Sequence, residues 1–367
     1  MNQSIQFPTN YQEIIARIEQ IDAKQYERTR NFINGAVTYL SPYISRGVIQ
    51  MPQVKEIVLK KYGRYISEKL VQELAWREFF QRVWQHKENQ IFSDLKQDQL
   101  NVAHHLIPAK IVDANTGIDA IDEAIQSLYT TGYMHNHARM YTAMLTCNIA
   151  KAHWLNPAKW MYYHLLDGDL ASNMLSWQWV AGSFSSKKYY ANQENINKYA
   201  GTKQQKTIVD YSYEDLPNQS IPENLQATIL LNLQTKLPIT ALPTINPGLP
   251  LLIYNSYNLD PNWHKEEKAN RILLLEPNHF AAYPISEKVL DFILALAVEN
   301  IPAIQVYVGS FDSLKQLSPQ TPIFYKEHPL NSHYSGTIES RSWLFEQVNQ
   351  YHGSFFSYWK KCERYYQ

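Results

Sequence analysis

Residues 131 to 179 could do chemistry, because this stretch mixes amides, carboxylates, a guanidinium and indoles into what otherwise reads as buried helix. Asp169, Asn173 and Trp177 recur at four-residue steps, so a helix would carry them on one face. Such a face could contact a flat ring system, with Asn173 hydrogen-bonding a ligand nitrogen. The alternative is a satisfied polar network within an all-helical core.

A second helical face in the same stretch carries Asn136 and Met140, which are four residues apart. Arg139 lies beside them, and a guanidinium is costly to bury without a partner. Asp167 is the carboxylate that we expect to pair with it. The two faces together could enclose a ligand, although the same ion pair would also serve a purely structural core.

The segment VQELAWREFFQRVW places Glu73, Trp76 and Arg77 on adjoining turns of one helix. A carboxylate, an indole and a guanidinium at neighbouring positions could bind a flat polar ligand. The structural alternative is an ion pair between Glu73 and Arg77 beside a core tryptophan.

Ser41 stands directly before Pro42, which is typical of a helix start where the serine oxygen caps free amides. With the Thr38 hydroxyl alongside, such an end could cradle a phosphate. Most helix starts of this kind bind nothing.

Metal chemistry is not indicated. His135 and His137 are two residues apart and would diverge on a helix. Cys147 and Cys362 lie far apart without a CxxC partner, which argues against a disulfide framework, a zinc site and a four-cysteine cluster.

The elements that must position these residues are mainly helices up to about residue 200, and the composition then changes. Prolines between residues 216 and 250 indicate a connector. Short apolar runs after it predict strands, with one helix between the second and third. We therefore predict an α+β multidomain chain: a helical domain over 1–215, a connector over 216–250, and a small α/β unit with a C-terminal helix over 251–367.

The charge balance gives no field that would steer the whole chain to nucleic acid. The 367 residues carry a formal net charge of zero and a sequence pI of about 7.2, so any DNA contact must come from a local patch. No basic, apolar leader opens the chain, and no run of about 18 apolar residues interrupts it. We expect a cytoplasmic monomer that does not enter a membrane.

Five ordered motifs give these residues a common context. They are a Tyr-x-x-x-Arg segment at 26–30, a Thr and Ser containing LSP loop at 38–42, an E-x-x-WRE helix at 73–78, a GYMHN-x-x-RM helix at 132–140, and DGDLA-x-N-x-x-x-WQW at 167–179. In this order they resemble the flavin-binding helical domain of the photolyase and cryptochrome family, over roughly Tyr26 to Tyr199.

The resemblance implies a bound FAD, with its phosphates near Thr38, Leu40 and Ser41 and with Asn173 facing flavin N5. It also implies an electron chain through Trp177 and Trp154, whose third member, near Asn101, is missing; another aromatic residue such as Trp160, Tyr162 or Tyr163 could replace it. The implied cofactor residues are Tyr26, Thr38, Leu40, Ser41, Arg77, Asn136, Arg139, Asp167, Asp169 and Asn173.

The resemblance further implies a deoxyribodipyrimidine photolyase-like carbon-carbon lyase. It would act on ultraviolet-damaged DNA by flipping out a cyclobutane pyrimidine dimer, to which excited reduced FAD gives an electron. Met140 favours this lesion, because the other main repair branch typically has a histidine there. The implied catalytic residues that line the dimer cavity are Glu73, Trp76, Asn136, Met140 and Trp179.

Two departures from the family pattern keep alternatives open. His137 replaces an arginine usual in the dimer-repairing branch, and a mostly uncharged histidine would weaken one contact to the lesion. A cryptochrome-like blue-light receptor without repair activity is therefore the main alternative, and a light-independent flavoprotein is the third.

The second departure is that the usual N-terminal antenna domain is absent from its expected place. The run of strand, strand, helix and strand after residue 250 loosely follows that domain, as though it were permuted behind the flavin domain. Whether it holds a second chromophore is left open. Residues 354–366 predict an amphipathic helix that docks onto the body.

Overall fold

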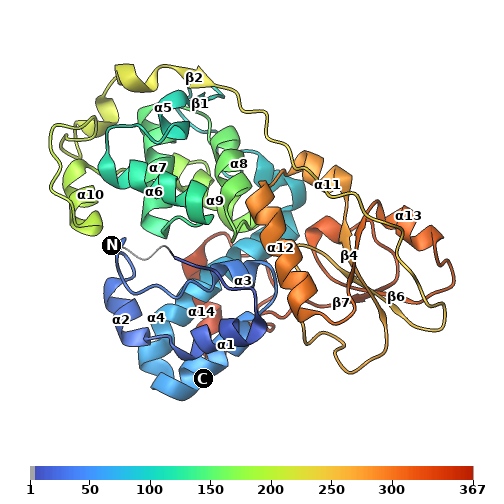
Figure 1. Ribbon diagram of the computed structural model, residues 1–367. Helices are drawn as coiled ribbons and strands as arrows, with labels where there is room; N and C mark the ends of the chain where they lie inside the picture. The colour runs from blue at the N-terminus through green and yellow to red at the C-terminus, as the bar shows by residue number, and fades with distance from the viewer. Residues whose placement is uncertain (1–4, 367) are drawn as a thin grey trace. The chain divides into compact units, whose positions relative to one another are not determined.

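The computed structural model describes residues 5–366, which form two compact units that interleave along the chain. Unit 1 contains Asp22–Val37 and Phe79–Asn232, and unit 2 contains Gln6–Ile21, Thr38–Glu78 and the chain from Leu233 onward. In Figure 1 the colour runs along the chain by residue number, from blue at the N-terminus to red at the C-terminus. The predicted boundaries at residues 215 and 250 remain a prediction, and each unit is described by itself.

Unit 1 is helical, as the amphipathic spacing of its sequence predicts. The long helix α4 (Met51–Lys87) begins in unit 2 and enters unit 1 at Phe79. Two short strands, β1 (Ile107–Pro108) and β2 (Thr228–Ile229), form an antiparallel pair. Through this pair, the first part of the predicted connector packs on the helical unit. Its remaining helices are α2 (Ala23–Thr29), α5 (Ala109–Val112), α6 (Asp119–Thr131), α7 (Asn136–Met144), α8 (Leu155–His164), α9 (Leu170–Ala181) and α10 (Gln193–Ala200), with a 3-10 turn at Glu88–Phe92 and a π-helical turn at Leu145–Ile149.

Local sequence fixes the ends of the helices that carry the candidate residues. Asp169 is the N-cap of α9, and its side chain accepts a hydrogen bond from the Ser172 amide. Helix α6 ends at Gly132, whose φ of 74° is in the left-handed region. A Cβ at this glycine would lie 2.5 Å from Leu166 Cγ. Both the backbone conformation and the packing against Leu166 therefore favour glycine here.

The core of unit 1 is built where α7, α8 and α9 pack together. Helix α9 buries residues around most of its circumference, including Leu170, Met174 and Trp177. A helix that is apolar on nearly all sides lies inside the protein rather than on it. Polar residues on α9 and α7 therefore reach a largely buried environment.

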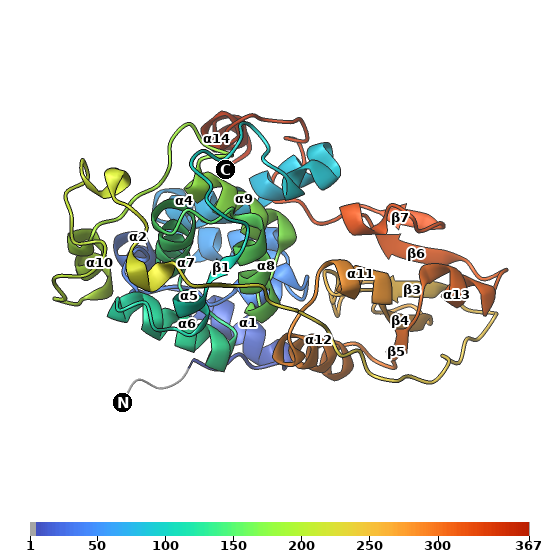
Figure 2. The same ribbon diagram turned by 90° about the horizontal axis from the view of Figure 1, so that it is seen from above.

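Unit 2 combines helices with a parallel sheet. The N-terminal helix is α1 (Tyr11–Glu19), and α4 is kinked at Gly63, which has φ 72° and ψ 174°. The sheet, in the described part of the chain, has five parallel strands in the order β5-β4-β3-β6-β7. They are β3 (Leu251–Tyr254), β4 (Asn270–Leu275), β5 (Gln305–Val308), β6 (Ile323–Lys326) and β7 (Thr337–Glu339), with helices α11 (Pro277–Ala282), α12 (Glu287–Asn300), α13 (Phe311–Gln316) and α14 (Phe355–Cys362). Figure 2 shows the strands side by side.

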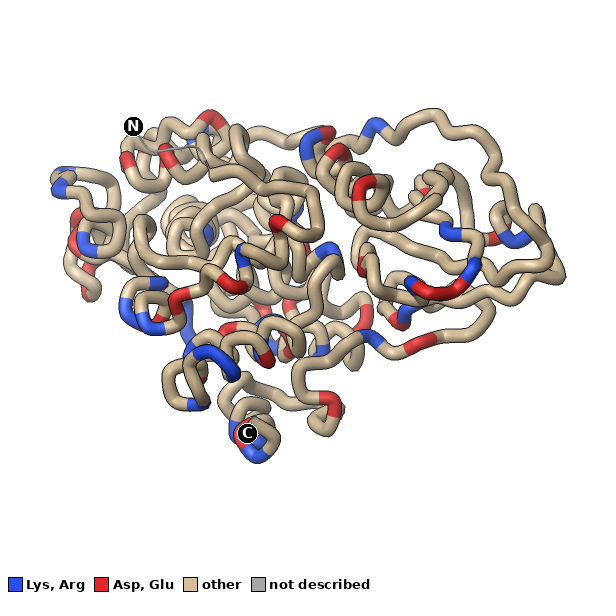
Figure 3. The backbone as a smooth tube through the Cα atoms, turned by 60° about the horizontal axis from the view of Figure 1, so that its bottom comes forward, with Lys and Arg blue, Asp and Glu red and all other residues tan. Residues whose placement is uncertain are grey.

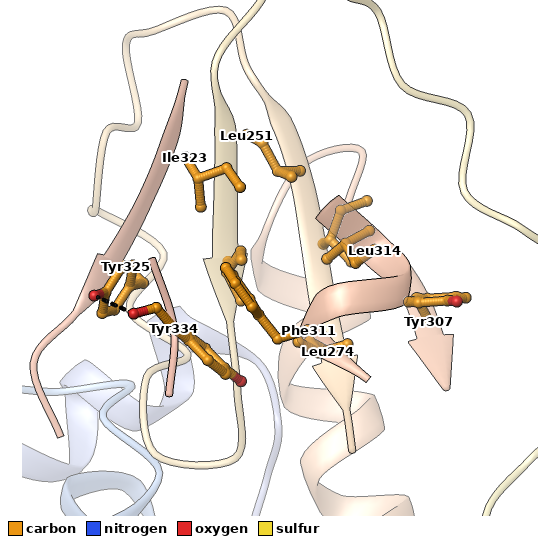
Figure 4. Close-up of a cluster of buried hydrophobic side chains, with 10 residues drawn as sticks. Leu251, Leu274, Tyr307, Phe311, Leu314, Ile323, Tyr325 and Tyr334 are labelled. Atoms are coloured by element: carbon orange, nitrogen blue, oxygen red, sulfur yellow. Dashed lines mark hydrogen bonds between the residues drawn. The ribbon is translucent and has the colours of Figure 1, made fainter. Parts of the chain in front are cut away.

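One face of the sheet is covered by α13. Alternate residues of three strands point to this face, as the two-residue period of a strand requires. The ring of Tyr334 stacks on Phe311 with centroids 4.5 Å apart, and the Tyr325 hydroxyl donates to the Tyr334 carbonyl (Figure 4). The cluster contains Leu251, Ile253, Ile272, Leu274, Tyr307, Phe311, Leu314, Ile323, Tyr325 and Tyr334.

The predicted α+β class is confirmed, with a helical part and a small parallel α/β part. The predicted strands and the helix between them correspond to β3, β4, α12 and β5. The predicted C-terminal helix is also confirmed, because α14 buries Phe355, Tyr358, Trp359 and Cys362.

The helix start at Ser41 corrects one expectation. Helix α3 (Ser41–Ser45) has Leu40 as its N-cap, and no side chain caps it. Leu40 already has a right-handed helical conformation, and its carbonyl accepts from Tyr43 N. The turn thus begins one residue earlier than Ser41-Pro42 suggests, so the Ser41 hydroxyl is not the cap.

The charges of the chain are mixed rather than separated. Figure 3 shows basic and acidic residues interspersed along the trace. No helix among residues 5–366 is long and apolar enough to cross a membrane.

Candidate functional site

Arg139 and Asp167 form the predicted ion pair in unit 1. Arg139 Nη2 lies 3.0 Å from Asp167 Oδ1 and 2.8 Å from Oδ2, and Arg139 Nε donates to the Met134 carbonyl at 2.8 Å. The Asp167 side chain is 6% exposed. The guanidinium is therefore oriented by two partners, and its charge is balanced by a carboxylate that is itself nearly closed to water.

Asp169 is held by a partner that the sequence analysis did not identify. One carboxylate oxygen accepts from Ser172 N at 2.7 Å, and the other accepts from Gln81 Nε2 at 2.5 Å. Gln81 is 2% exposed and lies four residues after Arg77 on α4. That spacing is the signal that could have identified it. Ser172 Oγ is buried and has no hydrogen-bond partner among the described residues.

The Asn173 side chain is oriented by a hydrogen bond that its own amide nitrogen donates. Its Nδ2 donates to the Ala158 carbonyl on α8 at 2.9 Å. Since the nitrogen is used within the protein, the carbonyl oxygen is the atom with which Asn173 can accept a bond from a ligand.

Helix α7 begins with the predicted polar face. Asn136 is exposed, and its Nδ2 lies 3.9 Å from Met140 Sδ, so the two residues share a face as their spacing predicts. The His137 ring lies 5.2 Å from that of Tyr199. Burial, with further contributions from His137 and Arg139, lowers the pKa of His135 to about 4, so His135 is neutral at pH 7.

The tryptophans of unit 1 differ in environment. Trp154 is fully buried and Trp177 is 2% exposed, whereas Trp179 is 38% exposed and lies 5.7 Å from the Tyr189 ring. Trp154 is the N-cap of α8, and Trp177 is on α9, which packs against α8. Buried indoles suit electron transfer, and a partly exposed indole suits stacking.

In unit 2, the predicted lesion-facing residues contact other parts of the chain. Glu73 Oε1 pairs with Lys69 Nζ at 3.2 Å, one turn away on α4. Trp76 stacks on Phe355 of α14, with ring centroids 3.7 Å apart and planes at 10°. One face of the Trp76 indole is therefore covered by the C-terminal helix.

Glu78 anchors that C-terminal segment and was not identified from the sequence. It is fully buried and accepts hydrogen bonds from the Leu344 and Phe345 amides and from the Tyr358 hydroxyl. Burial raises the pKa of Tyr358, and the Glu78 carboxylate adds to this effect. Only the WRE motif pointed to Glu78, and its partners lie more than 260 residues away in sequence.

The remaining predicted residues lie in both units. Tyr26 is in α2 of unit 1. In unit 2, Thr38 Oγ1 accepts from Leu40 N at 3.4 Å, Leu40 is 1% exposed, and Ser41 is the first residue of α3. Arg77 belongs to unit 2 as well. Their role toward a ligand remains a prediction.

The sequence that forms this site also resembles a known protein domain. Residues 70–217 match the model of the FAD binding domain of DNA photolyase. This part of the chain, less than half of its length, is therefore similar to the FAD-binding domain of the photolyases.

Curated relatives of this photolyase-type domain have consistent names. The chain is 31% identical over 151 residues to the deoxyribodipyrimidine photo-lyase of Streptomyces griseus, covering 40% of this chain and 32% of that protein. It is 28% identical over 193 residues to that of Escherichia coli, covering 48% and 40%. The chain thus spans well under half the length of these relatives.

A solved cryptochrome from Synechocystis overlaps 54% of this chain and 44% of its own, with 23% identity and a TM-score of 0.47. The similarity to photolyases is carried by the domain match and by the curated relatives.

The residues of unit 1 fit the cofactor that this domain type implies. FAD offers N–H groups, ring carbonyls and hydroxyls, and the unit presents the Asn173 carbonyl oxygen, the Arg139 guanidinium and the unsatisfied Ser172 hydroxyl. The donor and acceptor set therefore agrees with a flavin dinucleotide.

Proposed function

We propose that this protein is a light-driven flavoenzyme that splits cyclobutane pyrimidine dimers in DNA. Reduced FAD, when bound, supplies the photochemistry, in which an electron passes to the dimer and later returns. Two facts support the proposal: the photolyase-type domain, and the Arg139, Asp167, Asp169 and Asn173 cluster within it. The oriented Asn173 amide is the observation that carries it.

In this proposal, the residues of unit 1 have distinct tasks. Asn173 presents its carbonyl oxygen to the N–H at flavin N5, held there by the Ala158 carbonyl. Arg139 would help to hold the cofactor with its positive charge, which Asp167 balances and orients. Asp169, clamped by Gln81, accepts from the ring or its side chain. Tyr26, Thr38, Leu40, Ser41, Arg77 and Asn136 are the further cofactor residues proposed.

The Asn173 assignment is tested by Asn173→Asp. A carboxylate at this position would accept the N5 proton more strongly and repel an electron-rich ring, so a different flavin redox form should accumulate in light. The measurement is the absorption spectrum of the flavin-loaded protein during blue illumination with a thiol reductant. An unchanged spectrum would contradict the assignment.

The proposed catalytic residues are Glu73, Trp76, Asn136, Met140 and Trp179. Glu73 would hydrogen-bond a base edge of the dimer, and the two indoles would stack on it. Glu73 is suited to this, because its side chain is 34% exposed and its ion pair with Lys69 lies at the surface, where such pairs are weak.

The Glu73→Gln variant tests this set with a matched control. Repair under blue light should fall about tenfold or more with flavin still bound, because a charged acceptor is lost at the base edge. The control is Glu56→Gln, an exposed glutamate on the same helix, which should repair as the unchanged protein does. Loss of flavin from Glu73→Gln would instead indicate a structural role.

The second candidate is a blue-light receptor without repair activity, and the Trp76 stack favours it. Phe355 lies on an indole face that a dimer would need, and Glu78 holds the same C-terminal segment. A receptor would bind a dimer-containing oligonucleotide no better than an undamaged one, whereas a repair enzyme would prefer the damaged one.

A further inference from the structure

Trp154 donates its indole hydrogen to a carboxylate. Its Nε1 lies 2.6 Å from Asp94 Oδ1. Trp154 is fully buried, and the Asp94 side chain is 17% exposed. A buried indole N–H needs an acceptor, but a neutral carbonyl would be enough for that purpose. A charged acceptor at this distance can also take the proton itself.

Gln99 fixes the geometry of this contact. The Gln99 amide donates to Asp94 Oδ2 at 2.7 Å, and its side-chain oxygen accepts from Trp154 N at 3.0 Å. Gln99 Nε2 donates to the Ala152 carbonyl at 2.8 Å. Gln99 thus holds the Asp94 carboxylate through its backbone N–H and the Trp154 backbone through its side chain, so both partners of the indole hydrogen bond are fixed.

His153 faces the same oxygen of the carboxylate. Its Nε2 is 3.5 Å from Asp94 Oδ1, and its Nδ1 accepts from Leu155 N at 3.3 Å. Burial lowers the pKa of His153, partly opposed by Asp94, so the ring is neutral at pH 7. The negative charge of Asp94 is therefore not cancelled by His153 and faces the Trp154 indole.

We propose that Asp94 takes the indole proton of Trp154 when Trp154 is oxidised. This inference rests on the flavin binding of the proposed function: an oxidised flavin, when excited by light, would take an electron from Trp177, and Trp177 would then take an electron from Trp154. The Nε1–H bond of Trp154 breaks, its electron pair stays on nitrogen, and the proton goes to Asp94 Oδ1. The products are a neutral indole radical and a neutral carboxylic acid.

The chemistry favours this transfer. Removing an electron makes an indole N–H strongly acidic, and the proton has only a 2.6 Å hydrogen bond to cross. The transfer turns a buried ion pair into two neutral groups, which removes the cost of holding charges away from water. Return of the electron to Trp154 then requires return of the proton, so charge recombination slows. The hole can rest at Trp154 without a third tryptophan.

The test is the Asp94→Asn variant of the flavin-loaded full chain, followed by transient absorption after a blue flash. The deprotonated radical and the protonated radical cation of tryptophan have different spectra. We expect the neutral radical in the unchanged protein and the cation in the variant. Recombination in the variant should be faster by roughly tenfold, the factor for about 1.4 kcal/mol of barrier. Asp98→Asn, an exposed aspartate on the same segment, is the matched control.

Two further measurements keep the inference testable if Asp94→Asn folds poorly. In the unchanged protein, the step that forms the neutral radical should slow in heavy water, because an N–H bond breaks in it. The Trp154 indole proton should also resonate far downfield in NMR spectra, as expected for a short bond to a carboxylate, with or without flavin.

The outcomes separate this inference from the proposed function. Flavin that is bound but not reduced by light, with the downfield indole proton present, would overturn the electron path and with it this inference. The proposed function fails separately, if chemically reduced flavin leaves the dimers intact. A Trp154 radical that stays protonated in the unchanged protein, or that behaves identically in Asp94→Asn, would overturn the proton-acceptor role alone. A bond that only stabilises the fold would alter unfolding and leave the radical spectrum unchanged.

Discussion

The candidate residues of the two units differ in what contacts them. In unit 1, Arg139, Asp167 and Asn173 are oriented by neighbouring groups and keep atoms that a ligand can use. In unit 2, Trp76 and Glu78 are engaged by the C-terminal segment of the same chain. A residue that matches a family motif can therefore be occupied by another part of the same chain, as Trp76 is by Phe355.

The difference has a simple physical origin. A buried polar group is stable only when its hydrogen bonds are made, so short-range partners appear wherever such groups cluster. An exposed indole instead offers a large apolar surface, which any nearby aromatic residue can cover favourably. In unit 2, the Trp76 indole is therefore covered by Phe355 of the C-terminal helix. In unit 1, the polar cluster is held by hydrogen bonds to neighbouring groups.

The largest expected effect is that of Glu78→Ala. The Leu344 and Phe345 amides and the Tyr358 hydroxyl would lose their buried acceptor. We expect a loss of about 4 kcal/mol in the free energy of unfolding, since each unsatisfied group costs about 1 to 3 kcal/mol. Urea unfolding measures it, and Glu56→Ala on the same helix is the control. A loss below about 1 kcal/mol would show that the anchor is not needed.

Phe355→Ala should have the next largest effect and bears directly on the comparison. Truncating this buried ring should cost about 3 kcal/mol of stability. It should also expose the Trp76 face and raise the affinity for a dimer-containing oligonucleotide, as measured by titration. Phe356→Ala, whose side chain is 74% exposed, is the control and should change neither quantity much. Unchanged DNA affinity with lost stability would mean that the stack is structural only.

Asp167→Asn tests the cluster of unit 1. The Arg139 charge would lose its balancing carboxylate, which should cost about 2 kcal/mol in stability because that guanidinium is partly exposed. Flavin content per protein, read from absorbance, should fall as well. Asp113→Asn, at an exposed aspartate of the same unit, is the control. Full flavin content in Asp167→Asn would remove this pair from the cofactor site.

The smallest effect concerns a pH-sensitive contact between β7 and the loop before β4. His264 Nε2 lies 2.6 Å from Glu339 Oε1. Burial alone would raise the pKa of Glu339, but hydrogen bonds from Trp263, His264 and Lys326 lower it to about 2. Burial would likewise lower the pKa of His264, but Glu339 and Glu267 raise it above its usual value.

The sign of the pH dependence follows from these two shifts. The lowered pKa of Glu339 gives stability above about pH 4.5 that is lost as the pH falls toward 2. The raised pKa of His264 gives stability below about pH 6.5 that is lost as the pH rises through its folded value. The contribution of this pair is therefore greatest between these limits. In urea unfolding as a function of pH, Glu339→Gln should flatten both slopes, and a profile identical to the unchanged protein would contradict this account.

The sequence could predict the helices and the polar pair of unit 1, because these depend on local spacing. The four-residue steps of Asn136 and Met140 lead directly to their contact, and the cost of a buried guanidinium leads to Asp167. The strands β3, β4 and β5 were predicted from short apolar runs, whereas β6 and β7 were not. Residues of β7 are mostly exposed, so its sequence lacks an apolar period.

The contacts that the sequence could not predict join residues that are distant in the chain. The stack of Phe355 on Trp76 and the bonds to Glu78 depend on where the C-terminal segment returns. The Asp94 contact with Trp154 spans 60 residues and has no motif of its own. Such pairings follow from tertiary packing, which local periodicity does not encode.

The most direct test of the central claim is loss of cyclobutane dimers from a defined oligonucleotide under blue light, with flavin-loaded, reduced protein. The proposed function predicts that dimers disappear only in the light, and faster with Phe355→Ala than with the unchanged chain. If flavin is bound and reduced but neither protein removes dimers, the repair function is contradicted and the light-receptor alternative is favoured.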